Sequence, residues 1–250
     1  MRHALVETKR RFRDRSETCA TIIPVPATMA ELKLLLQAGN KRKRLIHTSH
    51  ALLMFLDQVV GDFNRWLRES GKSLRVLSLW KRVSAKNGTY WKPAGELSLS
   101  DSLCQYVRKR AKSLSAFREP FVDFYVKDGK NHRGFADLIV HAQDPEGRRS
   151  PAEVIIEVKG NWNREVQTNL RTQLLNHYLK KRAESKGMFL CGCYNLPGKS
   201  VVPGYATAAE AQMHLEMQRK ALPKKQAHRV LAKAVDCSLP KVPPRETRRR

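Results

Sequence analysis

The sequence predicts an α/β protein with a mixed central sheet flanked by helices. From residue 96 onwards, a helical pattern is followed by three strand-like segments, a second helix and a fourth strand. A meander of three strands followed by a helical crossover gives a sheet with antiparallel and parallel pairs and helices on both sides. The hydrophobic share of 41% is sufficient for a core in a chain of 250 residues.

Residues 1–90 are expected to form a basic, mainly helical N-terminal segment. One helix is expected over 28–39, with a capping box at its start and glycine at its end. Another is expected over 49–68, where apolar residues recur at helical spacing. Residues 74–82 fit a strand or a helix, and Asn87-Gly88 predicts a turn. Because two such helices bury little surface alone, we expect them to pack on the rest of the chain or on a partner.

Residues 91–239 are expected to form the domain that contains the sheet, and 240–250 a disordered basic tail. The first helix of this domain is expected to be capped by Ser98 or Ser100 and to reach Leu114. After this helix, three strands are expected over 121–126, 135–141 and 151–160. A helix over 163–182, a strand over 188–194, a helix over 206–222 and a strand over 230–237 are expected to follow.

The charge of the chain predicts a polyanionic partner. It has 48 Lys and Arg against 23 Asp and Glu, a net charge of +25, which favours binding to phosphates through counterion release. A solubilising surface charge and a ribosomal or membrane-surface role are alternatives. No apolar run is long enough to span a membrane, and Met1–Leu5 lacks the apolar core of a signal peptide. Five scattered cysteines without a CxxC pair predict neither a zinc site nor a disulfide framework, so a cytoplasmic setting is expected.

Charged residues in two strand-like segments form the candidate site. The apolar segment Val154–Gly160 carries Glu157 and Lys159, and both lie on one face because side chains alternate along a strand. Asp137 lies in the middle of the preceding strand pattern, 135–140. If the two strands are neighbours, Asp137 and Glu157 meet within the distance that one metal ion bridges.

Carboxylate oxygens suit Mg²⁺, and Mn²⁺ can substitute. Hydrolysis of a phosphodiester needs a metal that neutralises the phosphate and activates water, and a lysine can orient that water or stabilise the transition state. The simpler alternative is an ion pair between Lys159 and one of the acids, since Glu-x-Lys is common by chance. Gln173 lies in the apolar stripe of the following helix, where its amide must bond to the backbone or reach the active site or a bound phosphate.

These residues resemble the motif of the PD-(D/E)XK nuclease superfamily, which has the restriction-endonuclease-like fold. The resemblance covers about residues 96–195 and consists of Asp137, then Glu157-Val158-Lys159, then Gln173 followed by Tyr178. Ala136 stands where the nominal motif has proline, at a position that varies in the superfamily. The resemblance implies that Asp137 and Glu157 bind the metal and that Lys159 is catalytic.

The superfamily often adds an acid from the first helix. Glu96 is the candidate for this role, as a third metal ligand, and Glu119 is its rival. Residues 157–178 are also similar to nuclease domains at the C-termini of larger bacterial proteins, some of them linked to phage defence. Contacts with nucleic acid are expected from four residues: Arg133, Trp162, Arg164 and Tyr178. A plain turn is the alternative for Arg133, and for Trp162 packing is favoured over stacking on a base.

The expected function is a Mg²⁺-dependent DNA endonuclease that hydrolyses phosphodiester bonds by metal-activated water. The alternatives are a non-catalytic nucleic-acid-binding protein on the same fold, a nuclease acting on RNA or branched DNA, and a structural domain of a defence or transposition assembly. DNA is the favoured partner and no membrane is expected. A homodimer or a place in a larger bacterial assembly is compatible with the sequence.

Overall fold

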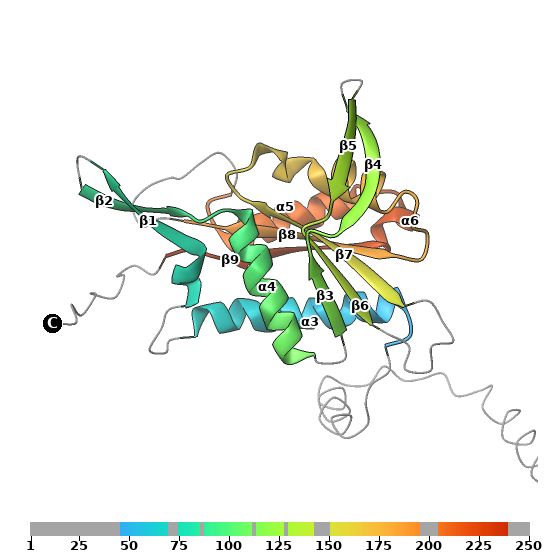
Figure 1. Ribbon diagram of the computed structural model, residues 1–250, viewed down its shortest axis with the longest axis horizontal. Helices are drawn as coiled ribbons and strands as arrows, with labels where there is room; N and C mark the ends of the chain where they lie inside the picture. Colours follow the sequence, from blue (N-terminus) through green and yellow to red (C-terminus); the bar gives the residue numbers. More distant parts are fainter. Residues whose placement is uncertain are drawn as a thin grey trace, which may run out of the picture. The chain divides into compact units, whose positions relative to one another are not determined.

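The computed structural model describes residues 46–69, 75–85, 88–111, 114–127, 130–142, 151–195 and 205–239, with only the backbone described for 121–127 and 130–134. The helix expected over 28–39 and the basic tail at 240–250 lie outside these residues. The described part of the chain forms an α/β structure with a five-stranded mixed sheet packed against helices (Figure 1).

The strand order in this sheet is β3-β6-β7-β8-β9. The strands are β3 (Leu114–Arg118), β6 (Leu138–Ala142), β7 (Ala152–Gly160), β8 (Lys186–Cys193) and β9 (Val230–Asp236). Strands β3, β6 and β7 pair antiparallel, whereas β7, β8 and β9 pair parallel. The predicted mixed sheet is therefore confirmed, with β7 at the change of direction.

Helices cover both faces of the sheet. On one face, α3 (Ser49–Arg68) and α4 (Glu96–Arg110) pack against inward side chains such as Leu138 and Ile156. On the other, the π-helix η5 (Leu170–Tyr178) and α5 (Ala208–Lys220) pack against side chains such as Ile139 and Ile155. Strands buried on both sides are apolar at nearly every position, which explains the continuous apolar run of β7.

Helix α3 matches the prediction for residues 49–68. Thr48 caps it by accepting a hydrogen bond from the N–H of Ala51. The apolar residues at helical spacing are buried, whereas Met54 lies outside this stripe and is exposed; the buried residues are Leu52, Leu53, Leu56, Val59, Val60, Phe63 and Leu67. They belong to the same hydrophobic cluster as the sheet, so this helix does pack on the later part of the chain.

The first helix of the sheet domain differs from the prediction at both ends. It begins at Glu96 with Gly95 as N-cap, not with Ser98 or Ser100, and Gly95 has φ 116°, which glycine adopts without strain. Leu114 is not helical but begins β3. The spacing of Leu114 continues the apolar stripe of the helix, so the sequence pattern did not show that a short strand begins there.

The segment 121–126 is a strand, but it does not join the central sheet. Strand β4 (Phe121–Lys127) pairs with β5 (Lys130–Phe135) in a separate two-stranded sheet. The residue before Pro120 is Glu119, whose φ of 46° breaks the extended backbone between β3 and β4. The antiparallel neighbour of β6 is therefore β3 rather than the predicted strand.

The helix expected over 163–182 is irregular and shorter. A 3₁₀ turn, η4 (Arg164–Gln167), precedes η5, and the side chain of Asn163 caps it by accepting a hydrogen bond from the N–H of Glu165 at 2.9 Å. Helix α5 and strand β9 confirm the last helix and strand, and a short helix α6 (Lys224–Ala227) lies between them.

A hairpin precedes α4. A 3₁₀ turn, η3 (Arg75–Leu79), leads into β1 (Trp80–Ala85), which pairs antiparallel with β2 (Gly88–Pro93). For residues 74–82, which fit either a strand or a helix by sequence, the structure has a helical turn followed by a strand.

Among the described residues, no helix has an apolar stretch long enough to span a lipid bilayer.

Candidate active site

The candidate site lies where β6 begins and β7 ends. The sequence predicted Asp137 in the middle of a strand, but it lies in the bend that separates β5 from β6. Leu138 pairs with Ile156 in the antiparallel ladder, so the next position along brings Asp137 opposite Glu157. The Oδ2 atom of Asp137 accepts a hydrogen bond of 2.7 Å from the N–H of Val158. The expected neighbourhood of the two strands is confirmed, and it brings the two acids together.

Glu157 has no exposed surface, and Lys159 is 8% exposed. The Nζ atom of Lys159 lies 2.7 Å from Oε1 of Glu157. Even so, neither oxygen of Glu157 receives a hydrogen bond of good geometry from the described residues. A buried carboxylate that lacks such donors is costly to maintain unless a cation compensates its charge.

The pKa values of the three groups follow from burial and mutual charge. Burial, with the nearby charge of Asp137, raises the pKa of Glu157 to about 8. Burial also raises the pKa of Asp137, and the hydrogen bond from Val158 only partly offsets this. For Lys159, burial lowers the pKa, but the negative charges of the neighbouring acids, Glu157 first, outweigh it, so the net shift is upward. A lysine that stays charged therefore lies beside two acids that resist ionisation.

Glu96 is the third acid at this place. As the first residue of α4, it accepts hydrogen bonds at Oε1 from the N–H of Gly160 at 2.9 Å and from Nδ2 of Asn163 at 3.0 Å. Its Oε2 lies 3.8 Å from Nζ of Lys159. Glu96 therefore joins the start of α4 to the end of β7, where the positive end of the helix dipole favours its charge.

Glu119, the rival acid, is directed elsewhere. Its carboxylate pairs with Arg118 at 3.4 Å, and its backbone N–H donates to the carbonyl of Asp137 at 3.2 Å. The structure thus places Glu96, rather than Glu119, against Lys159. No three His, Cys, Asp or Glu side chains of the described segments are arranged to hold one metal ion. Metal ligation by Glu96 accordingly stays a prediction, and its observed contacts are with Lys159, Gly160 and Asn163.

Gln173 takes part in a chain of side-chain hydrogen bonds. Its Nε2 donates to the hydroxyl of Tyr178 at 2.6 Å, and that hydroxyl donates to the carbonyl of Phe135 at 2.8 Å. Asn169 donates to Oε1 of Gln173 at 2.8 Å and to Glu165 at 3.0 Å. Phe135 lies two residues before Asp137, so this chain fixes the bend that carries the acid.

The amide of Gln173 bonds to side chains of its own helical segment rather than to the backbone. Contact of Gln173 with the active site or a bound phosphate stays a prediction, and its observed link to the bend runs through Tyr178 to the carbonyl of Phe135. Glu165 and Asn169 were not singled out from the sequence. Their spacing of four residues, continued by Gln173, was the available signal, because it aligns polar side chains along one helix face.

The residues expected to contact nucleic acid lie in different environments. Arg164 is exposed, and the side chain of Arg133 lies outside the described part of the structure. Trp162 is half-buried and packs edge to face on Tyr194 at 4.7 Å, which agrees with the packing alternative. Tyr178 is 3% exposed, so its ring offers little surface to a ligand and its hydroxyl positions the bend instead.

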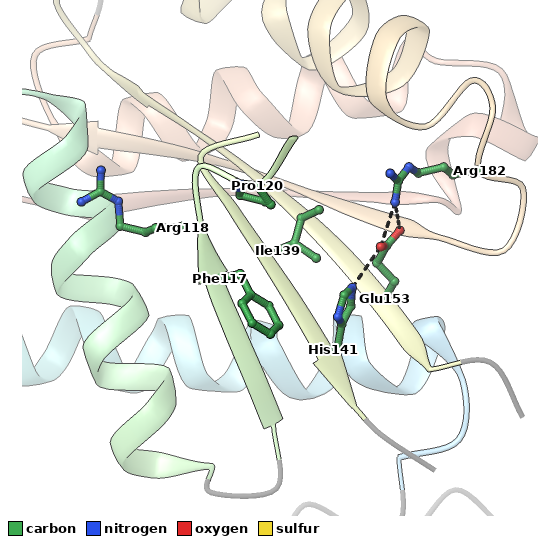
Figure 2. A pocket seen from close by; sticks show the side chains of 7 residues that line it. All are labelled: Phe117, Arg118, Pro120, Ile139, His141, Glu153 and Arg182. Atoms are coloured by element: carbon green, nitrogen blue, oxygen red, sulfur yellow. Dashed lines mark hydrogen bonds and ion pairs between the residues drawn. The ribbon is translucent and has the colours of Figure 1, made fainter. Parts of the chain in front are cut away.

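A second polar cluster lies beside an open pocket of about 420 Å³. Figure 2 shows Glu153 of β7 between His141 and Arg182 in this pocket. Glu153 accepts hydrogen bonds from Arg182 at 2.8 and 2.9 Å and from Ser185 at 2.6 Å, and it lies 3.0 Å from His141. Burial would raise the pKa of Glu153, but these partners outweigh it and lower the pKa to about 2. The cluster is a saturated structural link between β6, β7 and the segment after η5.

Comparison of the chain with protein-family models, with curated proteins and with solved structures finds no match. The resemblance to a nuclease superfamily therefore rests on the motif residues themselves. Function is accordingly argued from the chemistry of Asp137, Glu157, Lys159 and Glu96.

Proposed function

We propose that this chain is a Mg²⁺-dependent nuclease that hydrolyses phosphodiester bonds in DNA, on a fold of the restriction-endonuclease-like kind. The observation that supports it is the meeting of Asp137, Glu157 and Lys159 at the end of β7, with Glu96 behind the lysine. The change from antiparallel to parallel pairing at β7 is consistent with that fold.

The donor set fits a divalent cation. Glu157 is fully buried, and its oxygens receive no well-formed hydrogen bond from the described residues. Asp137 and Glu157 would hold the ion, since both offer the oxygen ligands that Mg²⁺ prefers. When bound, Mg²⁺ supplies neutralisation of the scissile phosphate and activation of the attacking water.

The other residues prepare the site for the reaction. Lys159 keeps its proton, and its Nζ can donate to a phosphate oxygen or to the attacking water. Glu157 and Glu96 both lie close to that ammonium group and limit its movement. The hydrogen bond from Val158 orients the carboxylate of Asp137. These contacts hold the groups in place before a substrate binds, which lowers the cost of reaching the transition state.

DNA is the proposed substrate because the chain carries a net charge of +25, which suits a long polyanion. One observation favours a second candidate, a nucleic-acid-binding protein without catalysis. The 2.7 Å contact between Lys159 and Glu157 is also the geometry of a structural ion pair, and no third metal ligand joins the acids among the described residues.

Cleavage assays separate the two candidates. The purified protein is incubated with supercoiled plasmid, linear DNA and RNA, in Mg²⁺ or EDTA. We expect plasmid nicking that needs Mg²⁺ and falls by at least about 100-fold in Asp137→Asn and Lys159→Ala. Asp62→Asn, a change of the same charge at a partly exposed position of helix α3, should cleave normally.

Cleavage that continues in EDTA, or is unaffected by Asp137→Asn, would contradict the metal mechanism. Preferential cleavage of RNA would overturn the choice of substrate. Binding of DNA without cleavage under any of these conditions would support the non-catalytic alternative.

A further inference from the structure

The hairpin β1–β2 forms a two-stranded sheet of its own and pairs with no strand of the central sheet (Figure 1). Isolated two-stranded hairpins are marginally stable in water, so the sequence must support this one in another way. Its base is anchored. The N–H of Ala94 donates to the carbonyl of Leu79 at 2.9 Å, and Nε1 of Trp80 donates to the carbonyl of Cys237 at 2.8 Å.

The two faces of the hairpin differ. Side chains alternate along a strand, so the buried Trp80 and the partly buried Trp91 share one face, which turns toward the core. The opposite face carries Lys81, Lys92 and Tyr90. Both lysines are exposed, and Tyr90 is 50% exposed.

The charge on this outer face is unfavourable for the free protein. Lys81 lies directly opposite Lys92 in the register, and like charges in facing positions repel. Residues 80–93 contain no acid and four bases: Lys81, Arg82, Lys86 and Lys92. An anion placed between Lys81 and Lys92 would relieve the repulsion, which is the complementarity that a row of phosphates provides.

The hairpin is connected to the candidate site by two routes. Along the chain, β2 ends three residues before Glu96. Through space, the ring of Trp80 packs on Tyr194 at 5.4 Å, and Tyr194 packs on Trp162 at 4.7 Å. Trp162 lies three residues after Lys159. The base of the hairpin, which carries Lys81 and Lys92, is therefore joined through packed rings to the segment that follows β7.

We infer that the outer face of the β1–β2 hairpin is a DNA-binding ribbon that lies in the major groove of a duplex. That groove is about 12 Å wide and admits a two-stranded β-ribbon. Lys81 and Lys92 contact phosphates, and Tyr90 makes apolar contact with base edges. The inference rests on the proposed DNA substrate and specifies where the duplex is held.

Binding of a short fluorescent DNA duplex, measured by anisotropy in EDTA at several salt concentrations, tests the ribbon without cleavage. The variant Lys81→Ala/Lys92→Ala should bind about tenfold more weakly. The slope of log K against log salt should fall in magnitude by about 1.8, at 0.9 for each lost phosphate contact. Tyr90→Ala should weaken binding without changing the slope, since a tyrosine releases no counterions.

Two controls make the result specific. Lys220→Ala/Lys225→Ala removes the same charge from exposed positions outside the hairpin and should bind as the wild type does. Lys81→Arg/Lys92→Arg keeps the charge and should retain both affinity and slope. Unchanged melting temperatures would show that the variants are folded.

Wild-type affinity and slope in Lys81→Ala/Lys92→Ala would overturn the inference. An equal loss of binding to an RNA duplex would overturn it too, because the deep, narrow major groove of A-form RNA does not admit side chains. If the wild type cleaves DNA while the hairpin variants bind normally, the DNA-binding role of the hairpin is contradicted and the nuclease proposal is not. If the variants lose binding but the wild type never cleaves, the nuclease proposal is contradicted and the DNA-binding role of the hairpin is supported.

Discussion

The carboxylate of Asp137 accepts a 2.7 Å hydrogen bond from the backbone N–H of Val158, the residue between Glu157 and Lys159. This bond joins the bend before β6 to the last residues of β7. It places two acids with raised pKa values side by side, and their mutual repulsion lowers the stability of the fold.

Replacing Asp137 by asparagine should stabilise the protein while abolishing cleavage. An asparagine oxygen can still accept from Val158, but the repulsion with Glu157 is removed. In EDTA we expect the free energy of unfolding to rise by about 1 kcal/mol, which raises the melting temperature by about 2–4 °C. Mg²⁺ should raise the melting temperature of the wild type and not that of the variant.

Thermal unfolding with and without Mg²⁺ measures both effects, and Asp62→Asn serves as the control, with a change within about 0.5 kcal/mol. Equal stabilisation of wild type and Asp137→Asn by Mg²⁺ would place the ion elsewhere.

Glu96→Gln should slow cleavage by about 10- to 100-fold, because it weakens the positioning of Lys159 and of the Gly160 backbone. Glu119→Gln removes the same charge from an acid that pairs with Arg118 and should stay within about twofold of the wild type. Single-turnover rates at saturating Mg²⁺ measure the difference. Equal losses in the two variants would mean that contact with Lys159 is not the cause.

Gly160 must remain without a side chain because Trp162 packs against it. A Cβ atom at this position would lie 2.4 Å from the indole ring. We expect Gly160→Ala to destabilise the fold by about 1–3 kcal/mol, as overpacking does. Gly61→Ala is the matched control: its Cβ meets nothing within 4 Å in helix α3, so it should stabilise by about 0.5–1 kcal/mol.

Denaturant unfolding measures these changes in stability. In a Trp162→Leu background the cost of Gly160→Ala should shrink, since the two positions are coupled. An unchanged cost in that background would assign the strain to another neighbour.

Glu153 should make stability depend on pH in the acid range. Its pKa falls from 4.5 in the unfolded chain to about 2 in the fold. The stabilisation is therefore fully present above about pH 4.5 and is lost as the pH falls toward 2. The full effect is about 3 kcal/mol at 1.36 kcal/mol per pKa unit. Unfolding of the wild type and of Glu153→Gln, compared from pH 6 to pH 3, should converge as the pH falls, and a constant difference would contradict this.

Much of the site could be predicted from local sequence pattern. Alternation in β7 correctly placed Glu157 and Lys159 together, and helical spacing correctly located α3. The bend at Asp137 could not be predicted. The segment from Phe135 to Val140 reads as one continuous strand with Asp137 in its middle, and the bond that helps fix the bend comes from Tyr178, which lies 43 residues beyond Phe135. Long-range contacts of this kind leave no local signal.

The separate pairing of β4 with β5 could not be predicted from the sequence pattern either. Residues 114–118 and 121–127 both have strand-forming side chains, and which of them joins β6 depends on register and on the backbone at Glu119. Sequence alternation predicts that a strand exists, but it does not identify the partner.

The bend at Ala136 and Asp137 is also one of two short links between the sheet of β4 and β5 and the central sheet, the other being Glu119 and Pro120. Its length is a constraint on how this protein can be changed. An inserted or deleted residue there would rotate the acid away from Glu157, although both sheets could still form. Engineering that grafts a different hairpin onto this scaffold must therefore keep the link at two residues, with the acid second.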